Sequence, residues 1–463
     1  MLGTELAKLL ETEHSGVGDA IALVDELDAA LVTGYSRPDD ARDAALARLA
    51  AAFASTPLAD RLAAAAQDLA SGQVTEEHLL SVAAGRSALM GSIHDALVSR
   101  LDDVTGRERS AGVDESGHAE RPTVPAYAAC RAWLTELAVG GLNAVDEDFI
   151  ASAGTIIEGL WQEPVHRRLA MILDGWCTEL RAKLPIAALA EVPVRRWADL
   201  WTRARILSEA NYPQYGATDR VSGRLLPVAV DVFDHDTLFG VVVHAVLESG
   251  ESSRLVRTTV SAPKVEVIAG AAMWDLITGA DRLRAALAED RALDLTDMPI
   301  TAYGDLLWDD AAVQLGGDAD PMATARMALP SAAPGTVPPL DRHPALIAEP
   351  VFVESYRVVK GEPLQFDLGG ATLDVNLKGL PAAGPVTDKN VAASKACIGM
   401  LRWDNGRWSL SPVAVLTNVK RQPTVLHTGQ WAQGATDPKV ARKVERDNVV
   451  NVLRERAGRL LRT

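Results

Sequence analysis

The chain has 463 residues, of which 48% are hydrophobic and 23% are charged. This balance is typical of a folded protein and excludes a fibrous or disordered chain, and the length predicts two or three domains. A formal net charge of −16 disfavours binding of nucleic acid or anionic membranes by the bulk of the protein.

The cysteine pattern and the apolar stretches indicate a cytoplasmic protein without membrane contact. Cys130, Cys177 and Cys397 are widely spaced and form no CxxC pair, which favours a reducing compartment. The N-terminal sequence carries acidic residues where a signal peptide needs a basic region and a longer apolar run. The most apolar later stretch, 238–247, has ten residues, whereas a bilayer span needs about 20.

Residues 1–104 are predicted to form an acidic bundle of four or five helices. Leu46, Leu49 and Phe53 belong to one apolar stripe at helical spacing, and Thr75 precedes two glutamates as a helix cap does. The segment holds 17 acidic residues against 7 basic ones. This excess is explained either by a solvated helix surface or by a docking face for a basic partner.

Residues 105–125 lose the helical periodicity and are rich in Gly, Ser, charge and Pro, which predicts a linker. A second helical domain is expected over 126–212. Its five tryptophans are expected to be core anchors, with a partner-binding groove as the alternative. They are Trp133, Trp161, Trp176, Trp197 and Trp201.

Residues 213–463 are predicted to form a mixed β/α domain. Short runs rich in Val and Leu, separated by polar turns, predict successive strands over 225–233, 239–247 and 255–260. A helix is expected over 269–288, and a long surface excursion over 316–344. The fold class is therefore α+β and multidomain, with a helical N-terminal half and a β-rich mixed C-terminal half.

The clearest local element is a hairpin over 398–416. Its turn, Asp404-Asn405-Gly406, tolerates the positive φ values that tight β turns require. Trp403 and Trp408 flank the turn and are expected to pair across the two strands. The pair is either a structural feature or an aromatic surface for a ligand or partner.

The C-terminal segment 438–463 has 8 basic residues against 3 acidic ones and is predicted to form a basic helix. Arg454, Arg456 and Arg459 are its interaction candidates. They are solvated, contact the acidic half, or bind an acidic partner. Binding of nucleic acid is a further, disfavoured possibility.

Sequence motifs of common enzyme classes are absent from the chain: it has no phosphate-binding GxxxxGK[ST] loop, no GxGxxG, no HExxH and no GxSxG. One remaining cluster places Asp231, Asp234, His235 and Asp236 at a strand end. Its oxygen and nitrogen atoms are of the kinds that hold a divalent cation, and an acidic β turn is the alternative.

The second cluster contains Asp341 and His343. A histidine beside carboxylates can act as a general base, because its unperturbed pKa near 6.5 is close to operating pH. The alternative is a loop in which Asp341 and Arg342 form an ion pair. No cofactor is predicted from either cluster.

Several strings resemble those of an uncharacterised actinobacterial family associated with gene clusters for MoxR-type AAA ATPases, von Willebrand A proteins and SWIM zinc-finger proteins. These strings are GRSALMGSIHDAL at 85–97, DLLWDD at 305–310, DRHPALIAEPV at 341–351, LRWDNGRWSLSPVAV at 401–415 and LRERAGRLLR at 453–462. The chain lacks the nucleotide loop, the metal-adhesion loop and the SWIM cysteines of those three proteins. The resemblance therefore implies a further component, with an AAA ATPase and a von Willebrand A protein as partners and no catalytic residues to carry over.

These observations predict a non-catalytic scaffold or adaptor in a cytoplasmic multiprotein system. The alternative is a hydrolase or a metal-dependent enzyme that uses the Asp and His clusters at 231–236 or 341–343.

Overall fold

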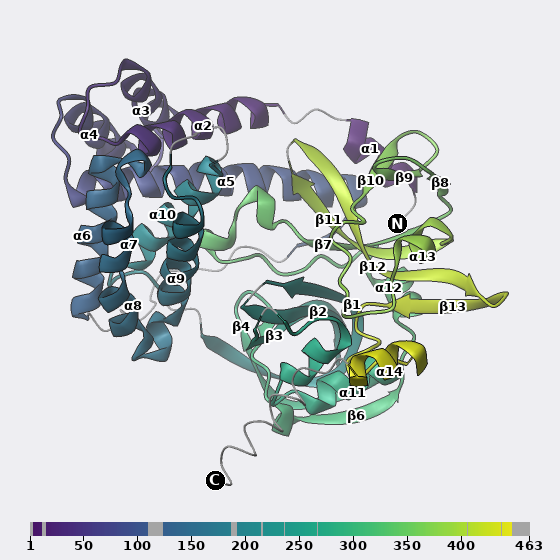
Figure 1. Cartoon of the computed structure of the whole chain (residues 1–463). Helices are drawn as coiled ribbons and strands as arrows, with labels where there is room; N and C mark the ends of the chain where they lie inside the picture. The colour runs from purple at the N-terminus through teal and green to yellow at the C-terminus, as the bar shows by residue number, and fades with distance from the viewer. Residues whose placement is uncertain are drawn as a thin grey trace, which may run out of the picture.

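The structure is a computed structural model that describes residues 3–11, 15–109, 124–186, 192–213, 216–235, 237–265, 267–404, 406–436 and 438–446. Helices fill most of the N-terminal half and two sheets lie in the C-terminal half (Figure 1), which confirms the predicted α+β class. Within the described ranges, each helix is too short or too polar to cross a lipid bilayer.

The acidic N-terminal segment forms helices, as predicted. They are α1 (Gly3–Glu11), α2 (Val17–Thr33), α3 (Asp40–Ala52), α4 (Ala59–Ala70) and α5 (Glu76–Thr105). The Thr75 side chain accepts a hydrogen bond from the His78 backbone N–H, which confirms the predicted cap. Helix α5 has 30 residues and runs from the other helices to the second sheet (Figure 1).

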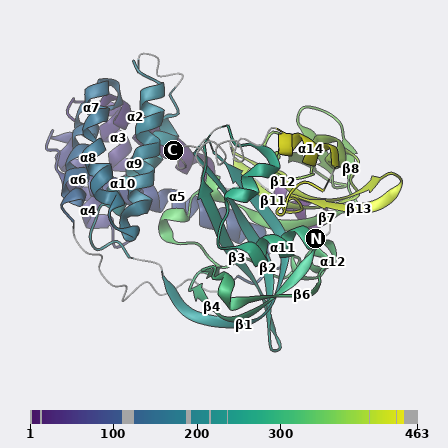
Figure 2. The same cartoon turned by 60° about the horizontal axis from the view of Figure 1, so that its bottom comes forward.

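The second helical set packs against the first (Figure 2). It comprises α6 (Pro125–Gly140), η1 (Leu142–Ala144), α7 (Glu147–Ser152), α8 (Gly154–Trp161), η2 (Pro164–His166), α9 (Arg167–Ala182) and α10 (Val194–Leu207). Four of the five tryptophans are buried as predicted, but Trp161 is 40% exposed. The buried stripe of α8 is Ile156 and Leu160, and Trp161 lies one position, about 100° of helix rotation, beyond it.

The first sheet closes on itself. Its strands are β1 (Ala217–Asp234), β2 (Leu238–Ser249), β3 (Ser252–Pro263), β4 (Arg291–Thr301), β5 (Asp305–Leu306) and β6 (Val313–Asp318). Pairings join β1 to β2, β2 to β3, β3 to β5, β5 to β4 and β4 back to β1, with β6 added to β4. The three predicted strands are therefore present as an antiparallel meander of β1, β2 and β3.

The helix expected over 269–288 is two elements, η4 (Gly270–Leu276) and α11 (Asp281–Glu289). The break contains Ile277 in an extended conformation and Gly279 with a φ of 72°. Both conformations are incompatible with a continuous helix. Trp274 of η4 meets Phe239 edge to face inside the closed sheet, so the break places an aromatic ring in the core.

The second sheet has the strand order β7-β11-β12-β10-β9-β8, with β13 paired to β12. Its strands are β7 (Glu349–Glu354), β8 (Arg357–Val359), β9 (Leu364–Asp367), β10 (Thr372–Val375), β11 (Ala396–Asp404), β12 (Arg407–Val419) and β13 (Gln422–His427). The predicted hairpin is confirmed: Trp403 is paired directly with Trp408, and Gly406 has a φ of 79°. Asn405 lies outside the described residues.

The surface excursion expected over 316–344 is partly structured. Shorter elements around the two sheets are η5 (Asp310–Ala312), α12 (Pro321–Ala328), η6 (Pro339–Asp341), η7 (Pro344–Leu346), α13 (Asp388–Ala392) and α14 (Pro438–Arg446). The Asp320 side chain caps α12, and Met322 and Ala325 are buried between the sheets. A single helical turn of apolar residues is too short a signal to find by periodicity.

One buried core joins the helices to the second sheet, because Leu97 and Leu101 of α5 share it with Val351 and Trp403. A second core fills the closed sheet, and a third lies between the two sheets. Arg107 and Arg109, from the predicted linker, bind the carbonyl oxygens of Leu329, Pro350 and Pro334. The start of that segment is thus part of the packed structure, whereas residues 110–123 lie outside the described ranges.

Candidate functional site

The first predicted cluster is engaged in structural ion pairs. The Asp231 carboxylate accepts hydrogen bonds of 2.6 and 2.8 Å from Arg402, which joins β1 to β11. Asp234 lies 2.6 Å from Lys264, and the backbone N–H of His235 donates to Leu238 in the turn before β2. Asp236 lies outside the described residues. In the part of the chain that the structure describes, no three His, Cys, Asp or Glu side chains are grouped to hold a metal.

The second predicted cluster contacts the helices. Asp341 accepts a 2.6 Å hydrogen bond from Arg168 and lies 3.5 Å from Arg203. The predicted ion pair between Asp341 and Arg342 is wrong, since Arg342 donates to the carbonyl oxygen of Val337 instead. Arg168 and Arg203 belong to α9 and α10. These helices are distant from Asp341 in sequence, but both contact its carboxylate in the folded chain.

His343 belongs to the same network. Its Nδ1 accepts a hydrogen bond from the Ala345 backbone N–H, so its proton is on Nε2, 3.7 Å from Asp199. Burial, together with the nearby Arg203, lowers the pKa of His343 to about 4 against the opposing effect of Asp199. The imidazole is therefore neutral at pH 7 and is a weaker base than the sequence predicted.

Asp199 connects this loop to a buried pair between α2 and α5. Arg86 donates to Asp28 at 2.6 and 2.9 Å, and their side chains are 3% and 2% exposed. The third guanidinium nitrogen of Arg86 lies 3.5 Å from Asp199. Burial favours a raised pKa for Asp199, but Arg203 and the other cations lower it below its usual range. These contacts connect α2, α5 and α10 to the loop that contains His343.

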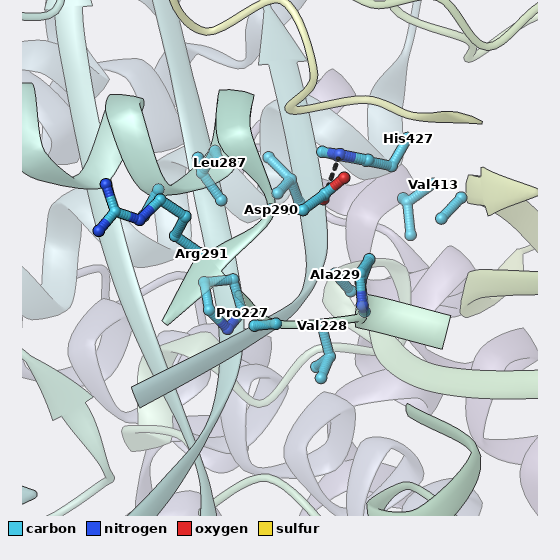
Figure 3. Close-up of a pocket in the computed structure, with 13 residues that line it drawn as sticks. Pro227, Val228, Ala229, Leu287, Asp290, Arg291, Val413 and His427 are labelled. Atoms are coloured by element: carbon cyan, nitrogen blue, oxygen red, sulfur yellow. Dashed lines mark ion pairs between the residues drawn. The ribbon is translucent and has the colours of Figure 1, made fainter. Parts of the chain in front are cut away.

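A histidine and aspartate pair that the sequence did not indicate lies between the two sheets. The Nε2 atom of His427 is 3.0 Å from the Asp290 carboxylate, and Figure 3 shows the two side chains pointing toward each other. The adjoining cavity has a volume of about 20 Å³ and is walled mainly by apolar residues such as Leu287 and Val413. This volume holds about one water molecule and is too small for an organic substrate.

No sequence signal joins these two residues. Asp290 ends α11 with a φ of 52°, and His427 ends β13. They meet because α11 and the end of β13 border one cavity beside residues 227–230 of β1. The residues that line the cavity in the described structure include no serine, threonine or cysteine.

The cysteine thiols are also poorly placed for chemistry. Cys130, Cys177 and Cys397 are all free and buried. Burial raises the pKa of Cys130 to about 12 and that of Cys177 to about 11. The thiolate that a nucleophile requires is therefore scarce at neutral pH.

Hollows far larger than the cavity beside His427 lie at the tip of the β11–β12 hairpin. Two adjoining hollows, of about 600 and 730 Å³, share Asp374, Arg407 and Trp408. We call them together the hairpin groove. The first is lined by Leu9, Leu10, Glu11, Val17, Gly18, Ile21, Gln365, Thr372, Asp374, Trp403, Gly406, Arg407 and Trp408. The second is lined by residues 361–364, 374–378 and 407–409 with Asp388 and Asp404.

The groove combines an apolar wall with charged side chains. Trp403 and Trp408 are each 6% exposed, so they contribute the edges of rings that are otherwise packed in the core. Five carboxylates and two cations line it: Glu11, Glu362, Asp374, Asp388, Asp404, Lys378 and Arg407. Within the described residues, none of these seven forms an ion pair, although Asp374 accepts a hydrogen bond of 2.7 Å from Gln365.

The structure describes only some of the residues that the sequence presented as interaction candidates. Trp403 and Trp408 line the hairpin groove, whereas Arg454, Arg456 and Arg459 lie outside the described residues. Helix α14 accounts for residues 438–446 of the predicted basic helix, and residues 447–463 lie outside the described residues.

A comparison with protein-family models finds no match, and comparisons with curated proteins and with solved structures find no significant similarity. The resemblance to the actinobacterial family therefore stays a prediction, and the function is argued from the geometry of the chain.

Proposed function

We propose that this chain is a non-catalytic scaffold or adaptor in a cytoplasmic multiprotein assembly, and that the hairpin groove receives a segment of a protein partner. The observation that carries the proposal is the pair of adjoining hollows, of about 600 and 730 Å³, beside Trp403 and Trp408. Ligand sites in proteins commonly have volumes of about 300–1,000 Å³, and tryptophan is enriched among the residues that dominate binding energy.

The ion pairs support this proposal over the enzyme alternative. A hydrolase or metal-dependent enzyme requires its acids and bases to converge on a substrate cavity. Asp231 and Asp234 are held by Arg402 and Lys264, whereas Asp341 is held by Arg168. The carboxylates of the two clusters therefore form separate ion pairs and do not converge on one cavity.

The resemblance noted in the sequence extends the proposal to specific partners. We infer that the assembly contains a MoxR-type AAA ATPase and a von Willebrand A protein, with this chain connecting them. The groove offers a binding surface for one of these partners.

Site-specific crosslinking tests the proposal. A photoreactive benzoylphenylalanine replaces Lys378, which is exposed in the groove, and in a matched variant replaces Glu251, which is exposed in the turn between β2 and β3. After irradiation of native cells, we expect a discrete crosslinked protein with Lys378→benzoylphenylalanine and none with the control. The identity of that protein tests the two partners, and uncrosslinked chain in both variants would refute the proposal.

A further inference from the structure

We propose that the hairpin groove recognises a basic, amphipathic segment of a partner protein, in which lysine or arginine alternates with large apolar residues. This inference rests on the proposed function and names the chemistry of the partner. It follows from three properties of the groove: its charge, its apolar wall and its unpaired carboxylates.

The charge of the groove is negative. Its five carboxylates and two cations leave a formal charge of −3. Glu362, Asp388 and Asp404 are exposed and form no ion pair among the described residues. Among the described residues no ion pair neutralises these charges, and they attract a cationic segment over about a Debye length, roughly 8 Å at physiological salt.

The apolar wall requires more than charge from the partner. Leu9, Leu10 and Ile21, from α1 and α2, face the same hollow as Trp403 and Trp408. A partner that buries apolar side chains against such a wall removes apolar surface from water, which favours binding. A purely polar cation leaves this apolar surface exposed to water. The segment that fits best therefore carries both cationic and apolar side chains.

Other classes of ligand fit the groove less well. Phosphorylated or nucleic-acid ligands meet an excess of carboxylates, which opposes their binding. A bare metal ion lacks a set of three converging His, Cys, Asp or Glu ligands in the described structure. The combination of negative charge and apolar surface is matched by a basic amphipathic peptide.

The test measures fluorescence anisotropy of labelled 12-residue peptides with the full-length chain. One peptide alternates Leu with Lys, a second alternates Leu with Glu, and a third alternates Ser with Lys. We expect the Leu/Lys peptide to bind most tightly, and its affinity to fall as salt rises. Equal or tighter binding of the Leu/Glu peptide would overturn the inference.

Two triple variants separate the groove from the general negative charge of the chain. The groove variant is Glu362→Gln/Asp388→Asn/Asp404→Asn. The control, Glu248→Gln/Glu251→Gln/Asp318→Asn, removes three charges that are also exposed, on the first sheet and in its β2–β3 turn. We expect the groove variant to weaken Leu/Lys binding about tenfold and the control to leave it within about twofold. Equal losses in both variants would overturn the inference.

A peptide of residues 447–463 of this chain is the competing occupant, because that segment is basic. If it displaces the Leu/Lys peptide at lower concentration than an unlabelled Leu/Lys peptide does, the assignment to a partner protein is wrong. Capture of a partner at Lys378 together with preference for the Leu/Glu peptide would refute only the partner's chemistry. Absence of a crosslink at Lys378 would refute the proposed function itself.

Discussion

At the scale of single residues, burial decides which ionisable groups are available for chemistry. The sequence presented His343 as a base near its ordinary pKa, but burial and the nearby Arg203 lower that pKa to about 4. His244 has a pKa lowered to about 3 by burial within the first sheet. Both imidazoles are neutral in the folded protein and take up a proton more readily after unfolding.

This difference predicts that the protein is destabilised by mild acid. The pKa of His343 is about 4 in the folded state and 6.5 in the unfolded state. Its contribution to the free energy of unfolding is therefore fully present above pH 6.5 and is lost as the pH falls from 6.5 toward 4. The contribution of His343 between pH 7.5 and pH 5 is about 2 kcal/mol.

The variant His343→Asn tests this assignment, because asparagine retains an acceptor for the Ala345 N–H and does not titrate. In denaturant titrations, we expect the variant to lose about 2 kcal/mol less stability than the native chain between pH 7.5 and pH 5. An identical pH dependence would show that His343 is not the responsible group.

At the scale of elements, the C-terminal ends of α2 and α6 approach so closely that only glycine fits at the contact. Gly34 ends α2 with a φ of 86°, and a Cβ atom added there would lie 2.5 Å from the carbonyl oxygen of Val139. Gly141, which ends α6, approaches Gly34 equally closely. No larger residue fits either position without moving a helix.

We therefore expect Gly34→Ala to lower the free energy of unfolding by about 3 kcal/mol or more, because backbone strain and overpacking add. Gly72→Ala is the matched control, since Gly72 has a φ of 84° but nothing within 4 Å of an added Cβ. Its loss is expected to be about 1 kcal/mol. Thermal denaturation of both variants checks the difference, and equal losses would contradict the close approach.

The buried pair of Asp28 and Arg86 makes a second prediction about α2 and α5. Arg86→Met leaves the Asp28 carboxylate buried without its partner, and we expect a loss of about 3–5 kcal/mol. In Asp28→Leu/Arg86→Met the buried charge is also removed, so most of that loss is recovered. A double-mutant cycle from urea denaturation measures the coupling; additive losses would show that the pair is not the cause.

At the scale of the whole molecule, the helical half and the second sheet share a core. Leu97 and Leu101 of α5 are buried with residues of β7 and β11, and Arg109 binds Glu349 at 3.0 Å. The predicted boundaries at 104, 125 and 212 stay predictions, but this buried core does not divide at residue 212.

A fragment of residues 1–212 is therefore expected to expose the face of α5 that the second sheet covers. We expect it to bind the dye ANS and to unfold at a lower temperature than the intact chain, because apolar surface has lost its partner. Calorimetry and dye fluorescence of the purified fragment measure this. A fragment with the stability of the full chain would establish an independent helical domain.

The features that the sequence predicted correctly are those that depend on local interactions. The α+β class, the cap at Thr75, the strands of the meander and the hairpin between Trp403 and Trp408 each depend on residues within a few positions of one another. Periodicity and turn chemistry report such short-range preferences directly.

Only the tertiary structure decided what the charged residues do. Asp341 meets Arg168 across 173 positions, and Asp231 meets Arg402 across 171. The hairpin groove likewise requires α1, α2 and β10 to converge on one hairpin tip. Such contacts arise from the packing of distant elements, which a pattern of neighbouring residues does not encode, so the partners of an ionisable group, and with them its role, emerge only when the chain is folded.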